Sequence, residues 1–248
     1  MNKRILGALS SLLLLVMLCS FMWPQQKLTI WMMGDSTMAI KAENKFPETG
    51  WGVPFAGQFK DYVTVVNTAK NGRSTKSFIH EGLWDKVYQG ARAGDYLFIQ
   101  FGHNDEKVDK PNVGSSIEQY KANLSLFVTS LRAKQAIPVL LTPIARRLFS
   151  GEALQDTHKG YPQAVKAVAA SLGVPLIDLT QLSSALLQKQ GKEQSVGLFL
   201  HLAAGAPNYP NGVTDNTHLN TVGAQAISDL VVQDIRRQQL PLIKDLKD

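Results

Sequence analysis

The sequence predicts an α/β fold built on a parallel sheet that is covered by helices on both faces. Short runs rich in Val, Ile and Leu alternate along the chain with segments whose apolar residues recur at helical spacing. Strands that are buried on both faces of a parallel sheet have this nearly continuous apolar character. Several of the runs end in glycine followed by polar residues. Because ligands bind at the carboxyl ends of parallel strands, function is expected at these strand ends.

Five strands are expected, one for each apolar run. Their ranges are 28–33, 62–67, 95–101, 137–143 and 174–179. The first run ends abruptly in Gly34-Asp35-Ser36. The serine is well placed to be a nucleophile, although Asp35 or Ser36 could instead cap the helix expected to follow. The rest of the chain decides between these interpretations.

Helices are predicted where apolar residues recur on one face. Phe55, Phe59 and Tyr62 are spaced for one face of a short helix, and Gly173 is the expected C-cap of a helix over 161–172. The other helices are expected over 116–135, 181–190 and 221–237. The region 191–216 is rich in Gly, Pro and Asn and reads as a long connection.

The N-terminal segment is set apart from the fold. Asn2-Lys3-Arg4 gives a positive start, and residues 5–23 carry no charge and centre on a leucine-rich run. This pattern predicts a signal peptide over residues 1–23, with an uncleaved anchor as the alternative. Cys19 is a candidate lipid-attachment site, although Leu18 before it is larger than lipoprotein signals usually allow. We therefore expect a secreted or periplasmic protein whose only membrane contact is through this segment or its lipid.

Residues 27–248 are expected to form a single domain, because no repeat and no linker divides them. Cys19 is the only cysteine, so a mature chain without it has neither disulfides nor Cys-based zinc sites. The formal net charge of +6 is scattered, and its longest cluster is Arg146-Arg147. This distribution argues against a nucleic-acid partner and is compatible with an acidic polymer such as a polyuronide.

A set of residues at the strand ends and near the C-terminus matches the needs of ester hydrolysis. That reaction needs a nucleophile, a base, a group that orients the base and donors for an oxyanion. Ser36 is the candidate nucleophile, His218 the general base and Asp215 the residue that orients the imidazole. Asp215 and His218 are close enough in sequence to share one loop, so a single docking event would bring both to the serine.

Three donors are candidates for the oxyanion hole. They are the backbone N–H of Ser36, at the expected start of a helix, the N–H of Gly72 and the side-chain amide of Asn104. Gly72 could also be an ordinary turn glycine, and Asn104 a turn residue. Motifs for the α/β-hydrolase nucleophile elbow, zinc hydrolysis and nucleotide binding are absent from the sequence.

Together these blocks resemble the SGNH (GDSL-type) hydrolase superfamily, named after the catalytic-block residues Ser, Gly, Asn and His. The matching residues are Ser36, Gly72, Asn104 and His218. The similarity extends to the rhamnogalacturonan acetylesterase branch over roughly residues 27–237. It is carried by Gly-Asp-Ser-Thr-Met at 34–38, Asn-Gly-Arg-Ser-Thr at 71–75, Phe-Gly-His-Asn-Asp at 101–105, Thr142-Pro143 with Arg146-Arg147, and Tyr-Pro-Asn-Gly at 209–212 before Asp-Asn-Thr-His at 215–218.

This resemblance implies a flavodoxin-like three-layer αβα sandwich with a central, mostly parallel five-stranded sheet. It also implies a Ser-His-Asp triad, no metal or other cofactor, and removal of O-acetyl groups from pectic rhamnogalacturonan. We therefore expect a secreted, monomeric carbohydrate esterase that acts on an acetylated polysaccharide. An esterase for xylan acetate, another acylated glycan or a lipid ester is the alternative enzyme. A non-catalytic glycan-binding protein is the alternative from another class.

Residues that contact the sugar are harder to identify. Arg146, Arg147 and Tyr209 are candidates, with a solvated face or a structural ion pair as the alternative for the two arginines. His103 is expected to have a structural role beside Asn104. The remaining histidines, expected at the surface or in loops, are His80, His158 and His201. Activity should fall on acidification, because a histidine base must be neutral to accept a proton.

Overall fold

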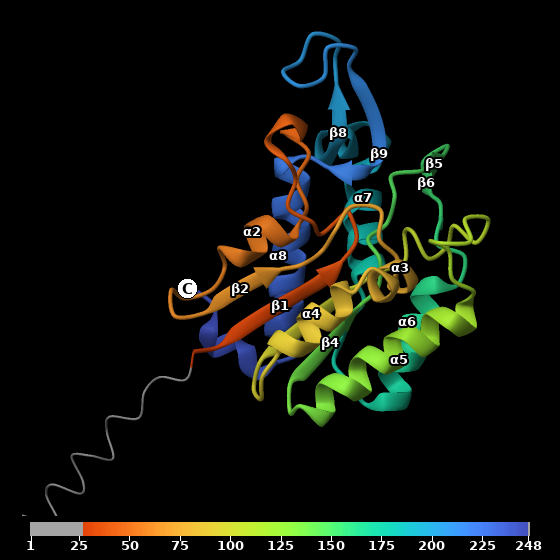
Figure 1. Ribbon diagram of the computed structural model, residues 1–248. Helices are drawn as coiled ribbons and strands as arrows, with labels where there is room; N and C mark the ends of the chain where they lie inside the picture. Colours follow the sequence, from red (N-terminus) through yellow and green to blue (C-terminus); the bar gives the residue numbers. More distant parts are fainter. Residues whose placement is uncertain (1–26, 248) are drawn as a thin grey trace, which may run out of the picture.

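A computed structural model describes residues 27–247, and a parallel sheet of five strands lies at their centre (Figure 1). The strands are arranged across the sheet in the order β2-β1-β3-β4-β7. Their bounds are β1 Thr29–Gly34, β2 Thr64–Asn67, β3 Tyr96–Gln100, β4 Ile137–Leu141 and β7 Leu176–Ile177. The predicted signal peptide or anchor over residues 1–23, with Cys19, lies outside the described residues.

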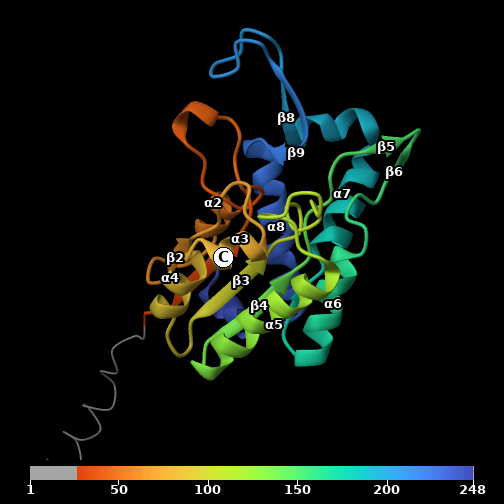
Figure 2. The same ribbon diagram turned by 45° about the vertical axis from the view of Figure 1, so that its right-hand side comes forward.

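Helices cover both faces of the sheet and give three layers, as Figures 1 and 2 show from two sides. One face is covered by α2 (Gly52–Ala56), α7 (Leu179–Gln194) and α8 (Thr221–Arg237). The other is covered by α3 (Thr75–His80), α4 (Leu83–Gly90), α5 (Ile117–Ala133) and α6 (Tyr161–Leu172). Three short 3-10 turns complete the helical segments of the described chain: η1 Glu43–Lys45, η2 Ser195–Leu198 and η3 Pro241–Asp245.

Alternate residues of the central strands fill two separate cores. In β3, Phe98 packs into the core beneath α8, whereas Leu97 and Ile99 pack into the core beneath α5. This alternation follows from the two-residue period of a strand. All three side chains are fully buried, and burial of one such side chain contributes about 1.5–3 kcal/mol. The apolar runs of the central strands β1, β3 and β4 are therefore buried on both faces, whereas the edge strand β2 is only partly buried.

The strand order brings two chain segments together at the edge where function is expected. The chain moves from β1 outward to β2 and then returns to the other side of β1 to form β3. The direction of the connections therefore reverses between β1 and β3. Open α/β sheets bind ligands in the crevice at the carboxyl ends of the strands at such a switch point. Gly34 pairs in register with Gln100, so the residues that follow β1 and β3 leave the sheet side by side.

The predicted fold class is confirmed, as are the three layers and the parallel sheet. The helix expected over 221–237 is α8, with the same bounds. Gly173 ends α6 in the left-handed conformation, at φ 58°, and its N–H donates to the carbonyls of Ala169 and Ala170. Glycine adopts this conformation without the steric cost that other residues carry.

Two expectations near the N-terminal half are wrong. The helix that was to carry Phe55, Phe59 and Tyr62 ends at Ala56, because the chain turns there. Phe59 still reaches the same core, and Tyr62 donates to Asp245 at 2.8 Å. No helix follows Ser36 either: residues 36–38 form a hydrogen-bonded turn. The helices α3 and α4 were not expected, since they are only 6 and 8 residues long.

The region 191–216 is not merely a connection. It contains η2 and the strand β8 (Phe199–Leu202), which pairs antiparallel with β9 (Val213–Leu219) in a hairpin separate from the main sheet. Figure 1 shows this hairpin extending beyond the carboxyl ends of the sheet strands. A second small hairpin is formed by β5 (Phe149–Ser150) and β6 (Ala153–Leu154). Across residues 27–247, no helix is long and apolar enough to cross a bilayer.

Candidate active site

Ser36 lies in a tight turn directly after β1. The carboxylate of Asp35 accepts hydrogen bonds from the N–H and the hydroxyl of Thr37, at 2.9 and 2.8 Å. The carbonyl of Asp35 accepts from the N–H groups of Met38 and Ala39. Asp35 therefore shapes the turn, as the sequence suggested, and Ser36 is left with its hydroxyl at the mouth of the crevice. The serine is mostly buried and retains 8% exposure.

Asp215 and His218 lie on β9, not on a loop as expected, and they form a bonded pair. Nδ1 of His218 is 2.7 Å from Oδ2 of Asp215. The backbone N–H groups of Thr217 and His218 donate to the other carboxylate oxygen at 2.7 and 2.9 Å. Burial raises the pKa of Asp215, but the hydrogen bonds from His218 and these N–H groups outweigh it and hold the pKa well below its usual value. The carboxylate is therefore ionised and aimed at the imidazole.

The same imidazole reaches the serine. Nε2 of His218 lies 2.9 Å from Oγ of Ser36, across 182 residues of sequence. Since Nδ1 of His218 faces a carboxylate, it carries the ring proton in the neutral form, and Nε2 is then the acceptor for the serine hydroxyl. Such a chain of Asp, His and Ser can withdraw the serine proton as the hydroxyl attacks a carbonyl carbon.

The β9 segment that carries the pair is braced from outside the main sheet. The side-chain carbonyl of Asn216 accepts from Nη1 of Arg147 at 3.1 Å and lies 2.9 Å from Nε2 of His201 on β8. The backbone N–H of Arg147 donates to the carbonyl of Asn216. The arginine also donates to Ser195 at 3.1 Å and to the carbonyl of Lys192. These bonds fix Asn216, one of the two residues between Asp215 and His218.

Each of the three groups that the sequence suggested for an oxyanion hole has an N–H without a protein acceptor among the described residues. Within the described chain, the backbone N–H groups of Ser36 and Gly72 donate no hydrogen bond. Nδ2 of Asn104 donates to the carbonyl of Arg73 at 3.1 Å, which leaves its second N–H without a protein acceptor among the described residues. Ser36 and Asn104 are buried, and buried polar groups are normally satisfied, whereas Gly72 is exposed. The unsatisfied donors fit a site that is completed by a ligand oxygen.

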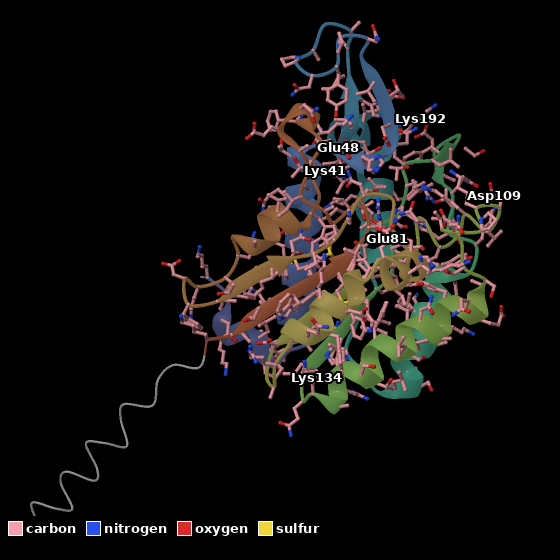
Figure 3. The ribbon with its side chains drawn as sticks, viewed as in Figure 1. Lys41, Glu48, Glu81, Asp109, Lys134 and Lys192 are labelled. Carbon is pink, nitrogen blue, oxygen red and sulfur yellow. The ribbon has the colours of Figure 1, made fainter. Side chains whose placement is uncertain are left out.

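The turn that carries Gly72 is held by charged side chains. Gly72 has φ +75°, a conformation that glycine adopts readily. Nζ of Lys41 donates to Oδ1 of Asn71 at 2.9 Å and forms a 2.6 Å ion pair with Glu48. Arg73 pairs with Glu81 at 2.9 Å. Figure 3 labels Lys41, Glu48 and Glu81 on the segments around this turn.

Asp105 anchors the start of α3 beneath the same turn. Its carboxyl group accepts from the N–H of Thr75 at 3.1 Å and from the Thr75 hydroxyl at 2.5 Å. Ser74 caps the helix by accepting from the N–H of Ser77. Burial raises the pKa of Asp105 to about 7, although the bonds from Thr75 oppose the shift. The β3 end and the Gly72 turn are thereby tied together.

A buried polar network lies behind Ser36, and sequence reasoning missed most of it. His103 is 2% exposed, and its Nδ1 lies 3.1 Å from Asp35, which confirms a structural role. Burial raises the pKa of Asp35, but His103 and Thr37 outweigh it and lower the pKa to about 2. Burial lowers the pKa of His103 despite this carboxylate. The pair therefore rests as carboxylate and neutral imidazole near neutral pH.

The network continues through His158, which lies in a loop, one of the two positions expected for it, but is not at the surface. His158 is buried, with its ring edge-on to His103 at a centroid distance of 4.8 Å. Its Nδ1 bonds Glu106 at 3.0 Å and its Nε2 bonds the carbonyl of Ile144 at 2.7 Å. Nothing in the sequence pointed to these two contacts, because Glu106 and Ile144 lie 52 and 14 residues from His158 in the chain. His80 is exposed as expected, and His201 lies on β8 rather than in a loop.

The residues predicted to contact substrate all have internal contacts in the structure. Arg146 forms an ion pair with Glu106, so the structural alternative considered for this arginine is what the structure shows. Arg147 is occupied by the contacts around Asn216 described above. Tyr209, in the loop between β8 and β9, donates its hydroxyl to the carbonyl of Lys45 at 2.8 Å. A role in sugar binding stays a prediction for all three.

A cavity of about 430 Å³ is lined by residues between Ile40 and Val53, in the segment that follows Ser36 in the chain. Its lining includes the exposed apolar side chains of Ile40, Phe46 and Val53 together with the Lys41–Glu48 pair. Apolar surface beside a few charged groups is typical of ligand-binding cavities. Within residues 27–247, no group of three or more His, Cys, Asp or Glu residues is arranged to hold a metal ion.

Comparisons with known proteins agree with this geometry. Residues 32–226 match the model of the GDSL-like Lipase/Acylhydrolase family. The chain is 38% identical to the rhamnogalacturonan acetylesterase RhgT of Bacillus subtilis over 220 residues, which cover 88% of this chain and 94% of RhgT. It is 31% identical to the probable rhamnogalacturonan acetylesterase YesY of the same organism over 218 residues, which cover 88% of this chain and 96% of YesY.

Solved structures share the fold. The protein YxiM of Bacillus subtilis has a TM-score of 0.74 at 27% identity, and the match covers 88% of this chain but 58% of that longer chain. A catalytic mutant of Axe2, an acetylxylan esterase from Geobacillus stearothermophilus, has a TM-score of 0.62 at 16% identity, over 84% of this chain and 93% of Axe2. With Ser36, His218 and Asp215 in one hydrogen-bonded chain, the protein belongs to the GDSL-like lipase/acylhydrolase family and is a serine esterase.

Proposed function

We propose that this esterase removes O-acetyl groups from a pectic polysaccharide, rhamnogalacturonan, through an acetyl-Ser36 intermediate. The observation that carries the mechanism is the position of His218, whose two ring nitrogens lie 2.9 Å from Ser36 and 2.7 Å from Asp215. The polysaccharide is supported by the names of RhgT and YesY, to which the chain is 38% and 31% identical.

In the first half of the reaction, Oγ of Ser36 attacks the acetyl carbonyl carbon while Nε2 of His218 takes the hydroxyl proton. The carbonyl oxygen becomes an oxyanion, which accepts hydrogen bonds from the N–H groups of Ser36 and Gly72 and from the Asn104 amide. Asp215 stabilises the imidazolium that forms. The ester bond then breaks as His218 returns the proton to the sugar oxygen, which leaves acetyl-Ser36.

In the second half, His218 takes a proton from water as the water oxygen attacks the acetyl carbonyl carbon. The same donors receive the oxyanion, the bond from the carbonyl carbon to Oγ breaks, and His218 returns the proton to Ser36. Acetic acid is released and the serine is regenerated. Each proton that leaves one oxygen is delivered to another by the same imidazole, so no other reactant is needed.

The cavity lined by the segment that follows Ser36 in the chain is a candidate site for the part of the substrate that extends beyond the acetyl group. Exposed Phe46 and Ile40 offer an apolar surface to a sugar ring, and the charged pair Lys41–Glu48 lies next to them. The N-terminal charge and leucine pattern supports export, so that the enzyme would meet its polymer in the periplasm or outside the cell.

The test is acetate release by purified protein from acetylated rhamnogalacturonan, acetylated xylan and a neutral aryl acetate, with lipid esters as a fourth group. We expect the highest kcat/KM on rhamnogalacturonan and no measurable acetate from Ser36→Ala at unchanged melting temperature. A higher kcat/KM on acetylated xylan or on a lipid ester would show that this compound, and not rhamnogalacturonan, is the preferred substrate. Full activity of Ser36→Ala would overturn the mechanism.

A further inference from the structure

The orientation of the Asn104 side-chain amide is determined by hydrogen bonds at both its nitrogen and its oxygen. Asn104 is 3% exposed. Its Nδ2 donates to the carbonyl of Arg73 at 3.1 Å, and its Oδ1 accepts from Nζ of Lys107 at 2.7 Å. A carbonyl can only accept and an ammonium can only donate, so the orientation of the amide follows from these two partners. Lys107, together with the Arg73 carbonyl, therefore fixes the orientation of the amide.

The ammonium of Lys107 is committed to this amide. Among the described residues, Lys107 forms no ion pair, and the amide oxygen of Asn104 is the one acceptor of its Nζ. Asp109, two residues further along and labelled in Figure 3, is exposed and makes no salt bridge with it. Burial lowers the pKa of Lys107, and the cations Lys110 and Arg146 add to the shift. The carboxylates of Asp35 and Glu106 oppose this shift without forming an ion pair with Lys107, so the ammonium is desolvated for its bond to the amide.

Such a contact changes the amide as a donor. A cation on the carbonyl oxygen draws electron density from the nitrogen, which makes the N–H groups more positive. Hydrogen bonds of charged groups are also shorter and stronger than neutral ones. One Nδ2–H of Asn104 bonds Arg73, and the second has no protein acceptor in the described chain. The polarisation is therefore available to an oxygen that enters the crevice.

We propose that Lys107 is a positioning residue for ester hydrolysis, whose ammonium holds the Asn104 amide in its donor orientation and strengthens the N–H that receives the oxyanion. This inference rests on the proposed function, because it assigns that N–H to the tetrahedral intermediate. Lys107 acts through Asn104 and not on the substrate. Its effect must therefore depend on Asn104 being present.

The experiment is a double-mutant cycle on a neutral aryl acetate, which avoids any contribution from binding of an acidic polymer. Loss of one whole oxyanion donor lowers kcat by about 10²–10³-fold, so we expect Lys107→Met to lower kcat by about tenfold with KM within about twofold. In the Asn104→Ala background, Lys107→Met should change kcat by less than about twofold. Lys107→Arg, which keeps a cationic donor, should recover part of the loss.

Lys110→Met is the matched control, since Lys110 is an exposed lysine of the same loop, and it should leave kcat unchanged. An unchanged kcat for Lys107→Met would overturn the proposal, as would an equal fold-loss in the presence and absence of Asn104. Melting temperatures identify any variant that fails to fold, and Lys107→Gln then replaces it in the cycle. If Ser36→Ala is inactive, the proposed function stands whatever the outcome for Lys107→Met. Full activity of both Ser36→Ala and Asn104→Ala would overturn the proposed function itself.

Discussion

The imidazole of His103 joins the turn that carries Ser36 to the segment after β3 that carries Asn104. Its Nδ1 is 3.1 Å from Oδ2 of Asp35, and both side chains are almost completely buried. Asp35 precedes Ser36 and His103 precedes Asn104. The distance between serine and amide is therefore set by a bond between their neighbours.

Removal of the carboxylate should loosen this link. Asp35→Ala leaves the N–H groups of His103 and Thr37 buried without their acceptor, and each unsatisfied group costs about 1–3 kcal/mol. We expect the free energy of unfolding to fall by about 2–5 kcal/mol in denaturant titrations. Asp35→Asn keeps one acceptor oxygen for Thr37, so its free energy of unfolding should fall by less than that of Asp35→Ala. Equal stability of wild type and Asp35→Ala would contradict the link.

Two glycines at strand ends should respond differently to alanine. At Gly72 an added Cβ meets no atom within 4 Å, so Gly72→Ala carries only the strain of φ +75°, about 1–2 kcal/mol. At Gly102 the Cβ would lie 2.9 Å from Cγ of Pro143, at φ +141°. We expect Gly102→Ala to lower both stability and kcat more than Gly72→Ala, because it displaces the strand end before Asn104. Thermal melts and aryl-acetate kinetics measure both, and the reverse ranking would refute the steric argument.

Ionisation of Asp105 should make stability fall between about pH 4 and pH 7. Its pKa is raised from 3.8 to about 7, so the folded state holds a proton that the unfolded chain has already released in this range. The stabilisation is complete below the unfolded pKa and is lost as the pH rises through the folded pKa, by a total on the order of 4 kcal/mol. Asp105→Asn has no such proton, so its stability relative to wild type should increase between pH 4 and pH 7 and then level off.

Denaturant titrations across this pH range measure the difference between the two proteins. Asp109→Asn, at an exposed position of the following loop, is the control for loss of one carboxylate and should run parallel to wild type. A constant difference between Asp105→Asn and wild type at all pH values would show that Asp105 is ionised throughout.

Arg147 should affect all substrates alike. Its guanidinium holds Asn216 between Asp215 and His218, so Arg147→Met should lower kcat by a similar factor on acetylated rhamnogalacturonan and on a neutral aryl acetate. A rise in KM confined to the galacturonate-containing polymer would instead assign the arginine to sugar binding. Arg146→Met, which breaks the pair with Glu106, provides the comparison within the same dipeptide.

The sequence was sufficient to predict the central sheet and to select three side chains that the structure joins by hydrogen bonds, for different physical reasons. The central strands β1, β3 and β4 are buried on both faces, so their apolar composition alone identifies them. Ser36, Asp215 and His218 were found because the chemistry of ester hydrolysis demands those residue types. Their spacing said nothing about secondary structure, and the assignment of Asp215 and His218 to a loop was wrong for that reason.

The missed features depend on partners far apart in the chain. His158 bonds Glu106 across 52 residues, and no local pattern encodes such a contact. The β8–β9 hairpin was hidden because its Gly- and Pro-rich tip dominates the composition of the region, while an irregularity between Phe199 and Leu200 breaks the strand register. Lys107 carries no motif at all, and only its 2.7 Å contact with Asn104 draws notice to it.

His218, the proposed base, lies on a hairpin outside the main sheet. Among the described residues, strands β8 and β9 pair only with each other, and the tip of their hairpin is bonded to residues 43–46 through Asn208 and Tyr209. Local structures of this kind open at lower free energy than a core sheet. Moderate heating should therefore open the β8–β9 hairpin and abolish activity reversibly, at a temperature where the circular dichroism spectrum is still that of the native protein.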